Sequence, residues 1–275
     1  MARTPTGAAQ YLVRFGEQSI ACSQYALTKL GVDRSHCFLK INEYVILCVP
    51  FQLGFKRALF LASLSKQELT FFQRYVNGIV GLSIAFTPGG QQEPIKFFIR
   101  CNLSTIGQMK GRENVGLFVV DYKAAPDDLV SMLGGFLENQ DRIRTLYDDY
   151  GKTMIRLTPE ISKIIGYNMY ATITEPNREG KRIQVYSLSS KSIEHLEAPG
   201  AEVRAPGTSV TYQLFFKKYR ISAAGSVIQA EILPQGLVRT TAQVAFSPEL
   251  VEIIDDYWYT ARTNSVQQTA DGGVS

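Results

Sequence analysis

The chain of 275 residues has room for one large domain or for two of ordinary size. Hydrophobic residues make up 45% of it and charged residues 20%, a composition that indicates a folded globular protein and excludes extensive intrinsic disorder. The formal net charge of +4 is compatible with an anionic ligand but identifies no class of partner by itself.

The chain carries no sequence signal for secretion, membrane insertion or metal binding. Residues 1–15 hold no apolar stretch long enough for a signal peptide, and charged residues, Pro50 and Gly54 interrupt the most apolar region, residues 44–64. The four cysteines form no C-x-x-C pair and are expected to be buried, reduced thiols, and there are only two histidines. We therefore expect a soluble cytoplasmic protein with no membrane span and no metal or cofactor.

The first half of the chain predicts a helix, then strands, then a second helix. Residues 1–36 are expected to form a helical segment, because residues 11–30 are weakly amphipathic and Gly31 is suited to end a helix. From residue 37 the chain consists of short β-branched and aromatic runs separated by turn residues, which is typical of an antiparallel barrel or sandwich. Residues 125–151 then have the proline and the early acidic residues of a helix start.

The second half repeats this plan. Residues 141–158 are expected to be a linker with a basic segment, followed by five strand-like runs and a helix that opens at Ser247. The predicted fold is mostly β with helices: two small antiparallel β-barrels, each closed by a C-terminal helix. The barrels are expected at residues 37–140 and 159–262, with a disordered tail at residues 263–275.

Three short similarities in the same order indicate an internal repeat, at an offset of about 120 residues, the size of one small domain. Ser63-Leu64-Ser65 matches Ser187-Leu188-Ser189. The run FFIRCNLSTIGQ resembles FFKKYRISAAGSVIQ, and DYKAAPDDLVSML resembles AFSPELVEII. The sequence therefore predicts two related barrels.

Two polar segments of the second repeat resemble the motifs of the PilZ domain, a six-stranded barrel with a C-terminal helix. Lys152 and Arg156, in KTMIR, have the spacing of the family's R-x-x-x-R segment, with Lys in place of the first Arg. Residues 187–192, SLSSKS, occupy the place of its [DN]-x-S-x-x-G turn. Ser189 matches the motif's serine, whereas Ser187 replaces Asp or Asn and Ser192 replaces Gly. The arrangement of the two domains looks like the spirochaete-type proteins in which a PilZ-like N-terminal domain precedes a PilZ domain.

The resemblance implies cyclic di-GMP (c-di-GMP) as the ligand. Arginine binds phosphate through two hydrogen bonds and stacks on a purine face, while the motif's Asp or Asn accepts hydrogen bonds from guanine. The ligand-binding residues implied here are Lys152, Arg156, Ser187, Ser189 and Ser192. Because Ser187 is neutral and Lys152 lacks the planar fork, the resemblance implies weaker binding than an unaltered motif, another nucleotide, or none. The first repeat has no such arginine pair, and we expect no nucleotide site there.

The same residues have simpler interpretations that need no ligand. Lys152 and Arg156 also suit a solvated basic face, and the three serines suit a polar turn that satisfies its own backbone. The run FFKKYR suits a half-buried strand better than a nucleic-acid surface, so no nucleic acid is expected as a partner. No nucleophile signature or phosphate-binding loop is present, so we expect a protein that is not an enzyme.

The sequence thus favours a bacterial, cytoplasmic cyclic di-GMP receptor that acts through ligand-coupled domain rearrangement. The alternative is a degenerate PilZ tandem that no longer binds nucleotide and works as a protein–protein interaction module. In that case an unidentified protein partner would contact surfaces such as the helix that carries Tyr257, Trp258 and Tyr259.

Overall fold

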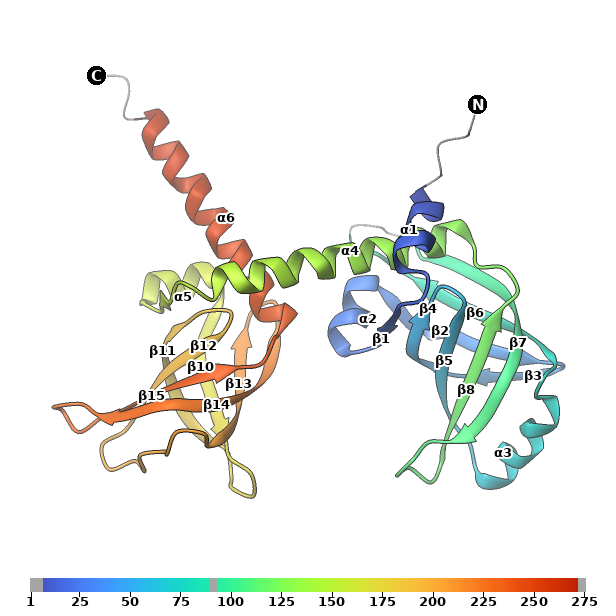
Figure 1. The fold of residues 1–275 in the computed structure, drawn as a ribbon, viewed down its shortest axis with the longest axis horizontal. Coiled ribbons are helices and arrows are strands. Elements are labelled where there is room, and N and C mark those ends of the chain that lie inside the picture. Colours follow the sequence, from blue (N-terminus) through green and yellow to red (C-terminus); the bar gives the residue numbers. More distant parts are fainter. Residues whose placement is uncertain (1–6, 90–92, 272–275) are drawn as a thin grey trace. The chain divides into compact units, whose positions relative to one another are not determined.

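The computed structural model describes residues 7–89 and 93–271. The chain divides into two compact units, Met1–Asn139 and Gln140–Ser275, and each contains one antiparallel sheet with helices (Figure 1). The predicted fold class, mostly β with helices in two successive antiparallel units, is confirmed.

The first unit contains an eight-stranded sheet in the order β1-β4-β5-β8-β7-β6-β2-β3. Its elements are α1 (Gly7–Phe15), β1 (Ser19–Ala21), α2 (Gln24–Leu30), β2 (Val32–Ile41), β3 (Tyr44–Leu47), β4 (Val49–Gly54), β5 (Arg57–Ser63), α3 (Lys66–Phe72), the 3-10 turn η1 (Gln73–Tyr75), β6 (Ile79–Phe86), β7 (Ile95–Gln108), β8 (Val115–Tyr122) and α4 (Asp127–Tyr150). Only Cys48 separates β3 from β4, and its N–H donates to the carbonyl of Cys37 in β2 at 3.0 Å. One continuous stretch therefore pairs with β2 at its start and with β5 at its end, which curls the sheet round on itself.

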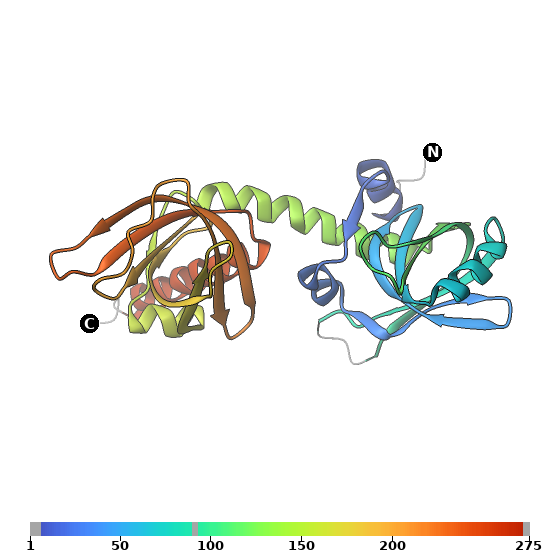
Figure 2. The ribbon, with the colours of Figure 1, turned by 90° about the horizontal axis from the view of Figure 1, so that it is seen from below.

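The second unit contains a closed six-stranded barrel. Its elements are β9 (Ile155–Arg156), α5 (Pro159–Ile165), β10 (Tyr167–Thr174), β11 (Lys181–Leu188), β12 (Ser192–Glu197), β13 (Ser209–Phe216), β14 (Arg220–Ile232), β15 (Val238–Val244) and α6 (Pro248–Asp271). The strand order is β10-β13-β14-β15-β12-β11-β9, and an additional β10–β11 pairing closes the ring (Figure 2). Strand β9 extends the sheet beside the end of β11.

Each sheet surrounds its own hydrophobic core. In the first unit, the buried residues of the strands pack with Leu129, Val130 and Leu133 on the early turns of α4. In the second unit, Leu250 and Ile254 of α6 pack into the barrel core in the same way. Both units therefore have a C-terminal helix that covers the core, as the sequence predicts.

The expected single helix at residues 11–30 is wrong, because the segment forms α1, β1 and α2. The side chain of Ser23 accepts the N–H of Ala26 and caps the start of α2, and Gly31 ends it in the left-handed conformation with φ 69°. A Cβ at Gly31 would also lie 2.1 Å from the carbonyl oxygen of Thr87, so the position requires glycine.

The bounds of the two units differ from those expected from the sequence. The first sheet already begins at Ser19, ahead of residue 37, and α4 occupies the first part of the expected linker at residues 141–158. The expected tail at residues 263–275 begins within α6, and residues 272–275 lie outside the described residues. The strand pairings thus extend each unit towards its N-terminus.

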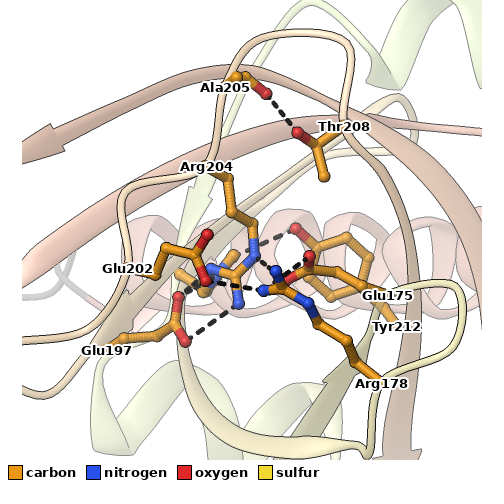
Figure 3. A network of polar contacts seen from close by, with 9 residues as sticks. Glu175, Arg178, Glu197, Glu202, Arg204, Ala205, Thr208 and Tyr212 are labelled. Carbon is orange, nitrogen blue, oxygen red and sulfur yellow. Dashed lines mark hydrogen bonds and ion pairs between the residues drawn. The ribbon is translucent and has the colours of Figure 1, made fainter.

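A buried ion network closes one end of the second barrel. Arg204, in the loop between β12 and β13, is buried and donates to both oxygens of Glu197 and, at 2.9 Å, to Glu175 (Figure 3). Arg178 lies 3.4 Å from the same Glu175 carboxylate and 2.7 Å from Glu202. The network fixes two loops with few apolar side chains to the barrel, the one between β10 and β11 and the one between β12 and β13. Removing Glu197 or Arg204 would leave the other as an uncompensated buried charge.

We predict that Glu197→Gln lowers the free energy of unfolding by about 3 kcal/mol at neutral pH, because Arg204 loses a buried charged partner. Burial raises the pKa of Glu197, but the neighbouring His195, 3.5 Å away, and the hydrogen bonds from Arg204 outweigh it and hold the pKa at about 2. The stabilisation is therefore fully present above the ordinary pKa of about 4.5 and is lost as the pH falls through about 2.

Urea unfolding at several pH values would measure this effect. The difference between Glu197→Gln and the unaltered protein should shrink as the pH falls below about 4.5. Glu202→Gln is the matched control, because its carboxylate is mostly exposed and its ion pair with Arg178 is screened by solvent, so the variant should unfold much like the unaltered protein. A pH-independent difference would contradict the assignment of the charge on Glu197.

Candidate ligand-binding face of the second barrel

The outer side of β9, β11 and β12 brings together two of the residues that the sequence indicates. Arg156 of β9 lies opposite Ser187 of β11, and Ser187 lies opposite Glu194 of β12. The next pair along, Leu188 and Ile193, is fully buried in the core. Since successive side chains on a strand alternate between its two sides, Arg156, Ser187 and Glu194 form a row across the outer side.

Ser187 and two charged residues form a chain of polar contacts on this face. The hydroxyl of Ser187 donates to Oε2 of Glu194 at 2.6 Å. Oε1 of Glu194 lies 3.7 Å from Nε of Arg239 in β15, and the same Nε donates to Glu231 at 2.8 Å. The hydrogen bond to Glu231 raises the pKa of Arg239, so the guanidinium is held in place as a cation.

Arg156 stacks on an aromatic ring beside this row. Its guanidinium carbon lies 4.9 Å from the ring centre of Tyr186, within the range of a cation–π contact. The carbonyl of Tyr186 accepts the N–H of Leu157 at 2.9 Å, which fixes β9 against β11. Arg156 is exposed, so its charge faces solvent while its direction is constrained.

Ser189 holds the turn between β11 and β12 by its side chain. Its Oγ accepts the N–H of Lys191 at 3.2 Å and that of Ser192 at 3.0 Å, and its own N–H donates to the carbonyl of Ser192 at 2.8 Å. Ser189 is completely buried, whereas Ser192 is half-buried. The structure therefore gives Ser189 a role in the turn backbone that needs no ligand.

The next residues fasten the turn to the end of α4. Ser190 is fully buried, and its hydroxyl donates to the carbonyl of Tyr147 at 2.6 Å. Nζ of Lys191 lies 2.6 Å from Asp148 and 5.0 Å from the ring centre of Tyr147. The turn and the last part of α4 thus form one connected structure.

Lys152 is not placed in the row. It is exposed in the turn between α4 and β9, and its Nζ pairs with Asp149 at 2.9 Å, three residues before it. The basic side chains of the KTMIR segment therefore differ: Arg156 is fixed on the barrel, whereas Lys152 has a local ion pair in solvent.

Two further findings concern cofactors and membranes. Within residues 7–89 and 93–271, no three His, Cys, Asp or Glu side chains come together in a group able to hold a metal ion. No helix in the same described ranges is both long and apolar enough to cross a membrane.

The first unit matches a known protein family. Residues 7–140 match the PilZN3 domain. The first unit is therefore a domain of PilZ type. The match confirms the PilZ-like N-terminal domain that the sequence predicts and does not extend to the motifs of the second repeat. Among curated proteins, nothing matches.

Solved structures with a similar outline come from PilZ-domain proteins. PlzA of Borreliella burgdorferi in complex with c-di-GMP is 11% identical, with a TM-score of 0.44 over 91% of this chain and 97% of that one. YcgR of Escherichia coli in complex with c-di-GMP is 9% identical, with a TM-score of 0.30 over 90% and 91%. MrkH of K. pneumonia in its apo state is 9% identical, with a TM-score of 0.32 over 97% and 99%. At these values the likeness is too low to bear on function.

Three residues of the face are not found by scanning the PilZ-type motifs along the chain: Tyr186, Glu194 and Arg239. Strict alternation would place Tyr186 on the opposite side of β11 from Ser187, and its contact with Arg156 coincides with the bulge between Val185 and Ser187. Glu194 and Arg239 join the face only through the β11–β12 and β12–β15 registers. The roles of Lys152, Arg156, Ser187, Ser189 and Ser192 in ligand binding stay a prediction.

We predict that Ser189→Ala lowers the free energy of unfolding by about 1–3 kcal/mol, because two N–H groups in a buried turn lose their acceptor. Ser192→Ala is the matched control, since its backbone, and not its hydroxyl, makes the turn hydrogen bonds. It should cost less than about 0.5 kcal/mol. Urea unfolding measures both, and equal values for the two variants would contradict a structural role for the Ser189 hydroxyl.

Proposed function

We propose that the chain is a non-enzymatic, cytoplasmic effector that binds cyclic di-GMP on the outer face of its second barrel. The observation that carries the proposal is the row of Arg156, Ser187 and Glu194 across three neighbouring strands. It combines an exposed guanidinium with a carboxylate that is held by the buried Ser187 hydroxyl, on the strands where the PilZ resemblance implies the site.

Arg156 is suited to contact both a phosphate and a purine. Its guanidinium is exposed on one side and rests on the Tyr186 ring on the other. A planar guanidinium can stack a base on its open face and donate two hydrogen bonds to a phosphate along its edge. The tyrosine reduces the entropy cost of binding, because it already restricts the arginine.

Glu194 supplies the carboxylate that is missing from the motif at Ser187. In the family motif, an Asp or Asn at this position accepts hydrogen bonds from guanine. Here Ser187 donates to one carboxylate oxygen of Glu194, and the other oxygen has only the long contact to Arg239 among the described residues. We infer that this second oxygen accepts the guanine N–H groups, so that the cross-strand pair replaces a single acidic side chain.

Lys152 is the weakest part of the proposed site. To reach a phosphate it has to exchange its ion pair with Asp149, which is exposed and therefore contributes little stability. We propose that Lys152 adds a screened, long-range attraction, while Arg156 supplies the directed contacts.

The alternative is a protein–protein interaction module that no longer binds nucleotide. Such a module would have less exposed aromatic surface on α6 than the sequence suggests. Tyr257 and Trp258 pack against the core of the second unit, with ring centres 5.2 Å apart. Of the three aromatic residues there, only Tyr259 is largely exposed, at 74%. The helix therefore uses two of its aromatic side chains for its own packing.

We predict that calorimetric titration detects cyclic di-GMP binding that Arg156→Ala and Glu194→Gln each weaken at least about 10-fold. Each change removes a charge-assisted contact, and such contacts are typically worth about 1.5–3 kcal/mol. Arg220→Ala is the matched control, because Arg220 also stacks on an aromatic ring, Phe215 at 5.1 Å, but lies outside the row. GMP serves as the control ligand.

The outcomes separate the two candidate functions. No heat from a protein shown to be folded would reject the receptor and favour the interaction module. Binding that Arg156→Ala and Arg220→Ala weaken equally would reject the proposed face.

We further propose that the ligand signal passes to α4. Ser190 and Lys191 connect the binding turn to Tyr147 and Asp148 in the last turns of α4. That helix begins at Asp127, in the first unit, and residues 140–150 belong to the second. A ligand that shifts the turn therefore changes the contacts of the helix shared by both units.

Small-angle X-ray scattering tests this transmission. We predict that saturating cyclic di-GMP changes the scattering profile of the unaltered protein, and that Ser190→Ala reduces the change while leaving the affinity within about 3-fold. An identical profile with and without bound ligand would contradict domain rearrangement, although not binding itself.

A further inference from the structure

The first unit has an exposed apolar face that the proposed nucleotide site does not use. Four large apolar side chains on β3, β6 and β7 are mostly in solvent: Phe98 is 74% exposed, Leu47 69%, Val45 60% and Ile79 51%. Such values are unusual for side chains that lie together on one sheet, and contiguous exposed apolar surface marks interaction sites. We call this surface, formed by the outer sides of β2, β3, β6 and β7, the outer apolar face.

The strand registers arrange the face in two rows. One row contains Leu47, Phe38, Ser83 and Phe98 in successive strands, and the next contains Val45, Lys40, Gly81 and Arg100. Because one row is mostly apolar and the other has two cations, the face is amphipathic across the strands. Neighbouring strands lie about 4.8 Å apart, so the backbones of Lys40 and Arg100 are separated by about 10 Å with Gly81 between them.

Gly81 leaves a hollow at the centre of the face. A cavity of about 700 Å³ lies there, bordered by Phe38, Lys40, Val45, Phe98 and Arg100 among others. A Cβ at Gly81 would meet only the Cβ of Lys40, at an ordinary 3.7 Å, so the fold itself does not require glycine at this position. The missing side chain creates room that a partner's side chain can fill.

The two charged residues that border the hollow, Lys40 and Arg100, are both positive. Both are exposed, and neither forms an ion pair with another residue of the ranges 7–89 and 93–271. Of the acidic residues on or beside these strands, Asp33 pairs with His36 at 2.7 Å, while Glu43, in the turn between β2 and β3, and Glu93, just before β7, are exposed and do not border the hollow. The face therefore presents unneutralised cations around an apolar depression.

We propose that the outer apolar face docks an acidic segment of another protein, which places one large apolar side chain in the hollow over Gly81. Carboxylates on either side of that side chain pair with Lys40 and Arg100. A central apolar anchor in a pocket surrounded by complementary charges is the usual arrangement of a specific protein interface. The concave centre favours such a segment over a lipid surface, which takes protruding side chains.

Selection from a library of random 12-residue peptides displayed on phage tests the proposal with the full-length chain. Phages that also bind the Gly81→Leu variant are removed, because leucine at this position fills the hollow. The recovered peptides should share a large apolar residue with Asp or Glu nearby. Synthetic copies should bind Gly81→Leu and Arg100→Glu at least 10-fold more weakly than the unaltered chain.

Gly107→Leu is the matched control, because Gly107 is also a strand glycine with open space around its Cα and lies outside the two rows. It should change peptide binding less than 2-fold, and thermal unfolding checks that all variants are folded. The proposal fails if no peptide is enriched, if the enriched peptides lack acidic residues, or if Gly81→Leu binds them normally. Binding to phosphatidylglycerol vesicles that Phe98→Ser abolishes, without peptide enrichment, would overturn it in favour of a membrane surface.

Discussion

The candidate ligand face depends on one constraint, the pairing of β11 with two successive partners along the same edge. The start of β11 pairs with β10 and thereby closes the barrel, and its end pairs with β9. Without β9 at that edge, Arg156 would lie in a loop with no fixed relation to Ser187. The pairing of two residues, Ile155 and Arg156, therefore decides whether the arginine lies beside Ser187.

The first unit has the same pattern of strand pairing, formed by different residues. Its stretch β3–β4 pairs first with β2 and then with β1, as β11 pairs with β10 and then β9. However, β1 carries Ser19, Ile20 and Ala21, and none of them provides a cation. The shared topology thus gives both units a short extra strand in the same place, and only the second unit carries an arginine there.

The repeat was predictable from the sequence as a whole, but two of its three matches are out of register. Phe97 and Phe98 lie within β7, whereas Phe215 and Phe216 end β13, the counterpart of β6. The alignment of residues before α4 with those before α6 is correct, since both lead into the helix that covers a core. The Ser-Leu-Ser match is wrong in register. Ser63 ends β5 and Ser65 caps α3 together with Glu68, whereas Ser187 lies in β11. By its pairing β5 corresponds to β12, and a three-residue similarity could not show this, because short apolar strands ending in serine look alike in either position.

The role of Glu194 could not be predicted from sequence motifs, because its place on the face depends on a strand register. The register between β11 and β12 shifts at a bulge between Val185 and Ser187, and this shift sets Ser187 opposite Glu194. A slip of one residue would turn Glu194 into the core and leave the Ser187 hydroxyl without its partner.

The position of Glu194 also affects which ligand base the face can bind. The carboxylate only accepts hydrogen bonds, and the Watson–Crick edge of guanine offers two neighbouring N–H donors, whereas that of adenine offers one donor beside an acceptor nitrogen. A carboxylate at this position would repel the adenine nitrogen, so the proposed cross-strand pair selects guanine even though the motif has lost its own acidic residue.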